Sequence, residues 1–209
     1  MTMLHNALPF LAQVLLVAVL VTVLFGKFVK NARQRMAVVA VLTVLGMLLP
    51  VSGLTFAQWL RSVVGDLSVL TFILFLDILA QRLSDHRLLD SATRNKLLSG
   101  VVLAGVVFYP LALGVSEFDA YRLGYDPVLM TAILCLASVF AWMKAYRGLA
   151  IILPLPLIAF NLQLLESTNL WDYLLDPIVM IYAVVQCAVY MKSLRTPVKW
   201  SRRMKNSSV

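Results

Sequence analysis

The chain contains 209 residues, of which 61% are apolar and only 13% are charged, and its mean hydropathy is +0.89. Because about a quarter of the residues in a soluble domain are charged, this composition excludes an ordinary soluble globular protein. The net charge of +8 is compatible with nucleic-acid binding. However, the chain holds no aromatic-plus-basic recognition motif, and we expect no nucleic acid among its partners.

Apolar runs without an ionisable side chain recur along the chain, for example at 11–25, 37–49 and 100–114. A helix needs about 20 apolar residues to cross the hydrocarbon of a bilayer, where backbone groups have to pair within the segment. We therefore predict an all-α integral membrane protein, a polytopic bundle of seven transmembrane helices in one domain at 1–195. The first run is expected to be a genuine span rather than a signal peptide, because residues 1–10 contain no Lys or Arg. The predicted spans are 8–27, 36–53, 67–83, 97–115, 127–145, 148–165 and 176–193.

The basic residues predict the orientation of the bundle. Of the 18 Lys and Arg residues, 16 fall in alternate loops or after the last span, and only Arg61 and Arg122 fall on the other side. Basic loops stay in the cytoplasm, so we expect an outside N-terminus, a cytoplasmic C-terminus and a basic cytoplasmic tail at 196–209. The basic face should contact anionic lipid headgroups. The compact loops favour the cell inner (cytoplasmic) membrane as the location of this multi-pass protein.

A short amphipathic helix is predicted at 55–65, between the second and third spans. Thr55 and Gln58 have the spacing of a capping box, and apolar residues then recur at helical intervals. Such a helix should lie flat at the outer interface, with the ring of Trp59 at headgroup depth. Its simplest interpretation is a linker between two spans, and the alternative is a binding element.

Two outer loops each end in an Asp-Pro pair at the start of a span, Asp126-Pro127 and Asp176-Pro177. Asp is a good N-cap and Pro suits the first helical turn, so both aspartates are interpreted as helix caps. An internal duplication is the alternative explanation of the shared pattern.

The same outer loops hold acidic and aromatic residues close together. Carboxylates beside aromatic rings can bind a sugar or a cation, or serve as acid and base where burial shifts a pKa. Against this, outer loops are hydrated and aromatic residues are common at membrane interfaces. The candidate catalytic carboxylates are Glu117, Asp119, Asp126 and Asp172, and the candidate binding side chains are Arg122 and Trp171.

A second group of candidates lies inside the predicted spans. Asp77 lies near the cytoplasmic end of the third span, where a charge is costly and often functional. It is interpreted either as part of a structural ion pair or as a transport or catalytic group. Pro154 and Pro156 should kink or break the sixth span, which continues to Asn161 and Gln163. Broken helices line binding sites in some transporters, although prolines also occur in membrane helices without this role.

The remaining residues indicate no cofactor. His5 and His86 fall on opposite sides of the membrane, and Cys135 and Cys187 lie inside predicted spans. We therefore expect no metal site, no haem and no disulfide. The sequence also lacks nucleotide-binding and hydrolase motifs, so an enzyme is not expected.

Together these observations favour a noncatalytic accessory or scaffold subunit of a cell-envelope biosynthesis or export machine. Its outer acidic-aromatic loops would contact a membrane protein partner, a glycan or a lipid headgroup. The first alternative is a small transporter or lipid flippase that uses Asp77 and the Pro-broken sixth span. The second is an integral membrane transferase or hydrolase that uses the outer carboxylates.

Overall fold

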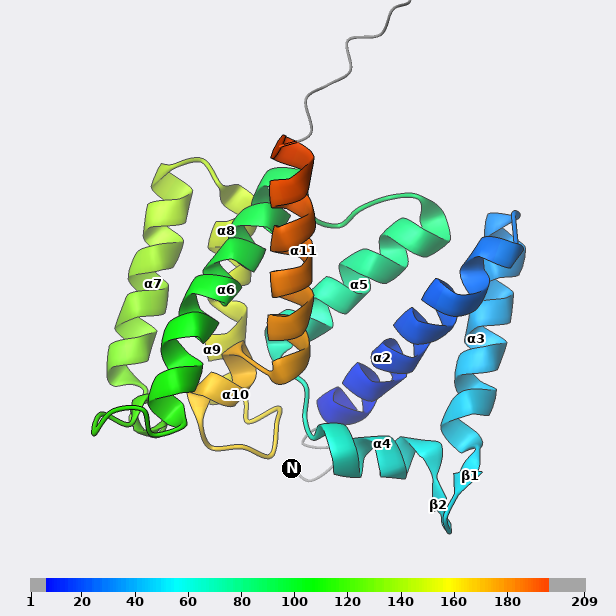
Figure 1. The fold of residues 1–209 in the computed structure, drawn as a ribbon, viewed down its shortest axis with the longest axis horizontal. Helices are drawn as coiled ribbons and strands as arrows, with labels where there is room; N and C mark the ends of the chain where they lie inside the picture. Colours follow the sequence, from blue (N-terminus) through cyan, green and yellow to red (C-terminus); the bar gives the residue numbers. More distant parts are fainter. Residues whose placement is uncertain (1–6, 196–209) are drawn as a thin grey trace, which may run out of the picture.

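The computed structural model describes residues 7–195, and this part of the chain is mostly helical (Figure 1). The tail expected at 196–209 lies outside the described residues. The first half contains α2 (Ala7–Phe25), η1 (Gly26–Phe28), α3 (Ala32–Leu48), β1 (Pro50–Val51), β2 (Leu54–Thr55), α4 (Phe56–Val64) and α5 (Val69–Ser84). The second half contains α6 (Ser91–Ala112), η2 (Ala120–Gly124), α7 (Val128–Met143), α8 (Arg147–Ile152), α9 (Leu155–Asn161), α10 (Leu170–Leu174) and α11 (Pro177–Arg195).

Helix is present at each of the predicted spans. The sixth is divided into α8 and α9, which are separated by Leu153 and Pro154, and this confirms the expected break at the prolines. In the described residues, two helical segments are long and apolar enough to cross a membrane, Leu8–Phe28 and Ser91–Ala112. Shorter apolar helical segments are Val128–Met143, Arg147–Asn161 and Pro177–Ser193.

The second predicted span ends earlier than the sequence suggested. α3 stops at Leu48, and an antiparallel hairpin follows in which Pro50 pairs with Thr55. Its turn is made by Ser52 and Gly53, with φ of 51° and 85°, a left-handed conformation that glycine adopts readily. The prediction of helix up to residue 53 is therefore wrong, because the proline and the Ser-Gly turn outweigh the apolar character of this run.

α4 forms where the amphipathic helix is predicted, and its capping box is confirmed. The Thr55 hydroxyl accepts the N–H of Gln58 at 3.3 Å, while the Gln58 side-chain oxygen accepts the N–H of Thr55 at 2.9 Å. Leu60 is buried, whereas Trp59 is exposed and stacks on Phe56. α4 runs across the ends of α2 and α3, as Figure 1 shows, so it lies crosswise to the longer helices.

α5 joins the two parts of the apolar core. One cluster of buried side chains involves α6 and the helices that follow it, and it includes Leu70 and Leu74 of α5. The other cluster involves α2, α3 and α4, and it includes Phe75 and Leu79 of α5. In Figure 1, α5 crosses the molecule between these two groups of helices. The position of α5 therefore determines how the N-terminal helices sit against the rest.

The start of α8 packs closely against α6. A Cβ atom added at Gly148 would lie 2.7 Å from the Oγ1 atom and 3.0 Å from the Cγ2 atom of Thr93, whose side chain is buried. Because a buried β-branched side chain has little freedom to move aside, this contact requires glycine. Gly100 of α6 offers a contrast, since nothing lies within 4 Å of the Cβ position there.

We expect Gly148→Ala to destabilise the protein by about 1–3 kcal/mol, because the new methyl group overlaps Thr93. The matched control Gly100→Ala should leave stability unchanged or raise it by up to about 1 kcal/mol, since alanine favours helix and the site is open. Thermal unfolding of the two purified variants in mild detergent measures both effects. Equal melting temperatures for the two variants would contradict this account of the α6–α8 contact.

Candidate functional site

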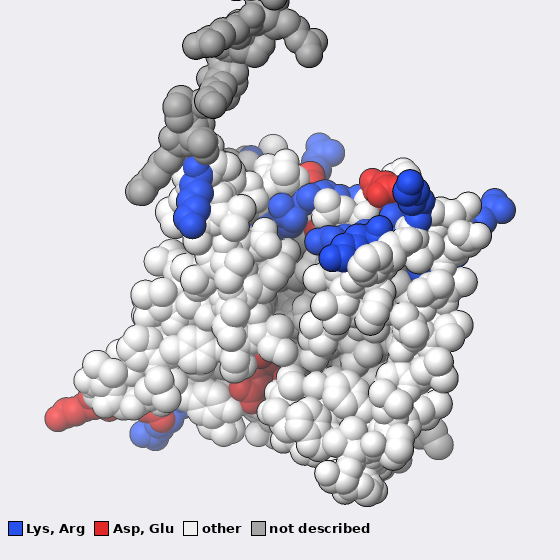
Figure 2. Space-filling model, turned by 45° about the vertical axis from the view of Figure 1, so that its right-hand side comes forward, with Lys and Arg blue, Asp and Glu red and all other residues white. Residues whose placement is uncertain are grey.

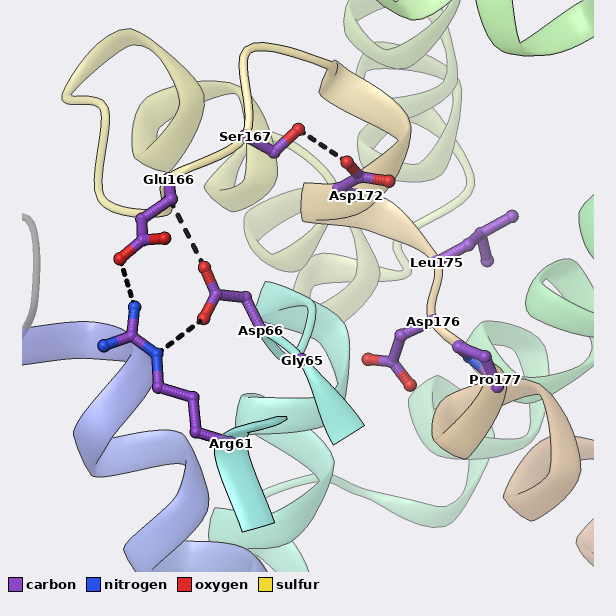
Figure 3. Close-up of a pocket in the computed structure, with 9 residues that line it drawn as sticks. All are labelled: Arg61, Gly65, Asp66, Glu166, Ser167, Asp172, Leu175, Asp176 and Pro177. Carbon is purple, nitrogen blue, oxygen red and sulfur yellow. Dashed lines mark hydrogen bonds and ion pairs between the residues drawn. The ribbon is translucent and has the colours of Figure 1, made fainter. Parts of the chain in front are cut away.

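A pocket of about 390 Å³ opens at the end of the molecule where α4, α5, α10 and α11 meet (Figure 3). Its lining combines several carboxylates with one guanidinium group, so the surface is predominantly negative. The lining residues are Arg61, Gly65, Asp66, Glu166, Ser167, Asp172, Leu175, Asp176 and Pro177.

Asp176 fixes the starts of two helices at the wall of this pocket. Its Oδ1 accepts the N–H of Val179 at 2.8 Å, which caps α11. Its Oδ2 accepts the N–H of Ser68 at 2.7 Å and the hydroxyl of Thr71 at 2.5 Å, both at the beginning of α5. Ser68 is itself the N-cap of α5, because its hydroxyl accepts the N–H of Thr71 at 3.2 Å. One buried carboxylate therefore holds α5 and α11 together.

Asp172 forms the second polar junction of the pocket. Its Oδ2 accepts the hydroxyl of Tyr121 at 3.0 Å and the hydroxyl of Ser167 at 2.5 Å. Burial, and then the Asp172 carboxylate, raise the pKa of the Tyr121 phenol above its usual value of 10.0. Tyr121 therefore stays protonated and donates its hydrogen to Asp172.

The two outer loops are joined by further hydrogen bonds behind Asp172. The indole N–H of Trp171 donates to the carbonyl of Ala120 at 2.9 Å, and the side-chain amide of Asn169 donates to the carbonyl of Tyr121 at 2.9 Å. Asn169 also accepts the N–H of Trp171 at the start of α10. The loop around η2 is thereby attached to the segment that forms the pocket.

Arg61 of α4 closes the opposite side of the pocket. Its guanidinium group forms an ion pair with Glu166 and a longer contact with Asp66, at 3.7 Å between Nε and Oδ1. The backbone N–H of Glu166 also donates to Asp66 at 3.4 Å. Figure 3 shows these three side chains together at one rim of the pocket.

The structure brings only part of the predicted outer site together. Asp172 lines the pocket, and the neighbouring Trp171 anchors the loop behind it. Asp119 lies outside the lining and accepts the N–H of Tyr121 at the start of η2, while Glu117 and Arg122 are exposed.

The interpretation of both Asp-Pro aspartates as helix caps is confirmed for one and wrong for the other. Asp176 caps α11 as expected. At α7 the N-cap position is occupied by Pro127, and no side-chain hydrogen bond caps the helix. Asp126 lies one residue too early for that role and is exposed.

Several pocket residues were not among the candidates from the sequence. Arg61 belongs to the amphipathic helix that the sequence analysis interprets as a linker, and neither Asp66 nor Glu166 is among its candidate site residues. One feature of the sequence could have indicated this site. Arg61 is one of only two basic residues on the predicted outer side, and the outer loops there carry most of the acidic residues. Ser68 and Thr71 also have helix-capping spacing, but the sequence does not reveal that they donate to Asp176.

Asp77 has an anchoring role in the structure. It is 1% exposed, and its Oδ1 accepts the N–H groups of Leu88 and Leu89, each at 2.9 Å. These bonds attach the segment between α5 and α6 to the interior of α5. Within the described residues Asp77 forms no ion pair.

Asn161 and Gln163 lie beside a second pocket of about 360 Å³ that shares Glu166 and Ser167 with the first. The Asn161 side-chain amide donates to the carbonyl of Leu157 at 2.8 Å, one turn earlier in α9. Gln163 ends the helical region with φ of 50°. Both residues therefore shape the chain reversal after α9.

The acidic pocket can offer hydrogen-bond acceptors and negative charge to a ligand, which suits cationic or hydroxyl-rich groups. Among the described residues, no group of three or more His, Cys, Asp and Glu side chains is arranged to hold a metal ion. No family model matches the chain, and neither a curated protein nor a solved structure matches it.

We expect Asp176→Asn to lower the free energy of unfolding by about 2–3 kcal/mol. The two carboxylate oxygens of Asp176 accept hydrogen bonds from three donors, whereas an amide has a single acceptor oxygen and leaves at least one donor without a partner. The matched control is Asp126→Asn, the other Asp-Pro aspartate, which should change stability by less than about 0.5 kcal/mol. Denaturant unfolding monitored by circular dichroism measures both. Equal losses at the two positions would show that Asp176 has no special structural role.

Proposed function

We propose that this chain is a multi-pass protein of the cell inner membrane with seven spans and an outside N-terminus. Helix at every predicted span supports this topology. Large apolar side chains are also exposed on these helices, including Leu103 (70% exposed), Leu136 (69%) and Ile181 (66%). So much exposed apolar surface is costly in water and favourable in lipid.

The distribution of charge supports the same topology. In Figure 2 nearly all Lys and Arg side chains in view gather at one end of the molecule, with some Asp and Glu side chains among them, and further Asp and Glu side chains lie toward the other end. The broad surface between the two ends carries almost no charge in this view. An uncharged belt between polar ends fits a bilayer, with the basic end in the cytoplasm.

We expect Ser116→Cys to react with a membrane-impermeant thiol reagent in intact cells, and Ser84→Cys to react only after the cells are opened. Both serines are exposed, and the proposed topology puts them on opposite sides. Both variants carry Cys135→Ala and Cys187→Ala so that no other thiol reacts. Labelling of the Ser84→Cys protein in intact cells, without labelling of the Ser116→Cys protein, would invert the topology.

Within this membrane we assign the chain the role of a noncatalytic accessory or scaffold subunit of a cell-envelope biosynthesis or export machine. The observation that carries this role is the acidic pocket, which opens at the proposed outer face. Each of its four carboxylates already accepts a hydrogen bond or forms an ion pair within the chain. Carboxylates held in this way suit recognition of a partner, a glycan or a lipid headgroup better than proton transfer.

Two observations weigh against the alternative roles. A transporter would use Asp77, but this carboxylate accepts two backbone N–H groups and anchors a loop. A transferase or hydrolase would use a group of outer carboxylates, but of Glu117, Asp119, Asp126 and Asp172 only Asp172 lines the pocket.

We expect a photo-reactive amino acid at position 166 to crosslink to one defined envelope component in intact cells. The Glu166 side chain lines the pocket and is 58% exposed, so replacement leaves the fold intact. The matched control is position 117, an exposed acidic residue of the same end that lies outside the pocket lining. The same products from both positions, or turnover of an envelope lipid or glycan by the purified chain alone, would overturn the proposed role.

A further inference from the structure

The acidic pocket lies where two of the proposed spans begin. Its lining includes Asp66, which shortly precedes α5, and Asp176 and Pro177 at the start of α11. In the proposed topology both helices start at the outer face, so the pocket is level with the boundary between headgroups and hydrocarbon. Figure 2 shows acidic side chains in a recess that adjoins the broad uncharged surface of the molecule. A lipid of the outer leaflet therefore has its headgroup at the level of the pocket.

α4 forms one wall of the pocket and also exposes apolar side chains. Arg61 of α4 and Gly65 at its C-cap line the pocket, while Trp59 and Val63 of the same helix are exposed. An aromatic ring and apolar side chains on a helix that lies crosswise to the spans are typical of a membrane interface. This wall of the pocket is therefore expected to border the headgroup layer.

Three groups of the pocket keep polar atoms that have no hydrogen-bond partner in the described part of the chain. Asp172 accepts both of its hydrogen bonds at Oδ2, which leaves Oδ1 without a donor. Glu166 contacts Arg61 through Oε1, which leaves Oε2 without a donor. Arg61 donates to Glu166 through Nη2 and approaches Asp66 through Nε, so the N–H groups of Nη1 have no acceptor. In Figure 3 all three side chains line the same pocket.

These atoms define the groups that a ligand has to supply. Two carboxylate oxygens on separate side chains are complementary to an ammonium group, which carries a positive charge and several N–H donors. The Nη1 atom of Arg61 is complementary to an acceptor, and phosphate oxygens match the guanidinium group. A ligand in which an ammonium and a phosphate are close together satisfies both requirements. The pocket volume of about 390 Å³ is within the usual range for small-molecule sites.

Other headgroups fit the lining less well. Four carboxylates and a single guanidinium group line the pocket, so an anionic headgroup without an amine is repelled. A choline headgroup has a positive charge but no N–H donor, so it forms no hydrogen bond with the carboxylate oxygens. A neutral sugar supplies hydroxyl groups but no charge to balance the carboxylates.

We propose that the acidic pocket binds the phosphoethanolamine headgroup of a phospholipid in the outer leaflet. The ammonium group donates to Asp172 and Glu166, and the phosphate accepts from Arg61 at the rim. The inference rests on the topology and the recognition role proposed above. It narrows the ligand of the pocket to a zwitterionic lipid with a primary amine.

The test titrates the purified full chain in mild detergent with short-chain phosphatidylethanolamine, phosphatidylcholine and phosphatidylglycerol. A ligand that binds the folded state raises the melting temperature, so thermal unfolding at increasing lipid concentration measures each affinity. We expect phosphatidylethanolamine to stabilise the protein at the lowest concentration. Equal or stronger stabilisation by either of the other two lipids, or stabilisation by none of them, would overturn the proposal.

We expect Glu166→Gln to weaken the binding of phosphatidylethanolamine by about tenfold, because one charge-assisted hydrogen bond becomes a neutral one. The matched control is Glu117→Gln, an exposed acidic residue of the same end outside the lining, which should bind like the unmodified protein. Arg61→Gln and Arg122→Gln form a second pair, since these are the two outer basic residues and only Arg61 lines the pocket. The proposal fails if neither pocket variant weakens binding, or if the controls weaken it equally.

Failure of this inference is distinguishable from failure of the proposed role. If position 166 crosslinks to a defined protein or glycan and phosphatidylethanolamine is not preferred, the headgroup site is wrong and the accessory role stands. If phosphatidylethanolamine is preferred but positions 166 and 117 give the same crosslinked products, the accessory role is wrong and the headgroup site stands.

Discussion

The hydrogen bonds of Asp176 hold the two long elements α5 and α11 at a common starting point. This matters beyond the pocket, because α5 contributes to both apolar clusters and so connects the N-terminal helices to the remainder. Apolar packing alone has little directional preference and would permit α5 to slide along its neighbours. A buried carboxylate with three fixed donors permits one register only, and the acidic pocket is built on that register.

Charged side chains have different hydrogen-bond partners at the two ends of the molecule. At the acidic end, carboxylates are satisfied within the chain by Tyr121, Ser167, Arg61 and backbone N–H groups. At the basic end, Arg35 pairs with Asp85 and donates to the carbonyl of Leu83, whereas the buried Nε atom of Arg94 has no hydrogen-bond partner within the described residues. The hydrogen bonds at the acidic end hold its side chains in place, which lowers the entropic cost of recognising a ligand.

Much of the fold could be predicted because the responsible interactions are local. Apolar runs located the helices, Pro154 and Pro156 located the break between α8 and α9, and Thr55 with Gln58 located the start of α4. Where two local signals competed, the prediction was less successful. Helix was expected to residue 53, but the apolar run gave way to a hairpin at Pro50, and Pro127 took the cap position expected for Asp126.

The sequence by itself determined where helices form and how charge is divided between the ends, because these properties depend on composition within short windows. Only the tertiary structure decided which polar groups meet. Asp176 and Thr71 are separated by 105 residues, and Tyr121 and Asp172 by 51. The pairing of such distant groups depends on how helices pack, and no spacing in the sequence encodes it. For the same reason, only the structure shows that Asp77 anchors the segment between α5 and α6 through the N–H groups of Leu88 and Leu89.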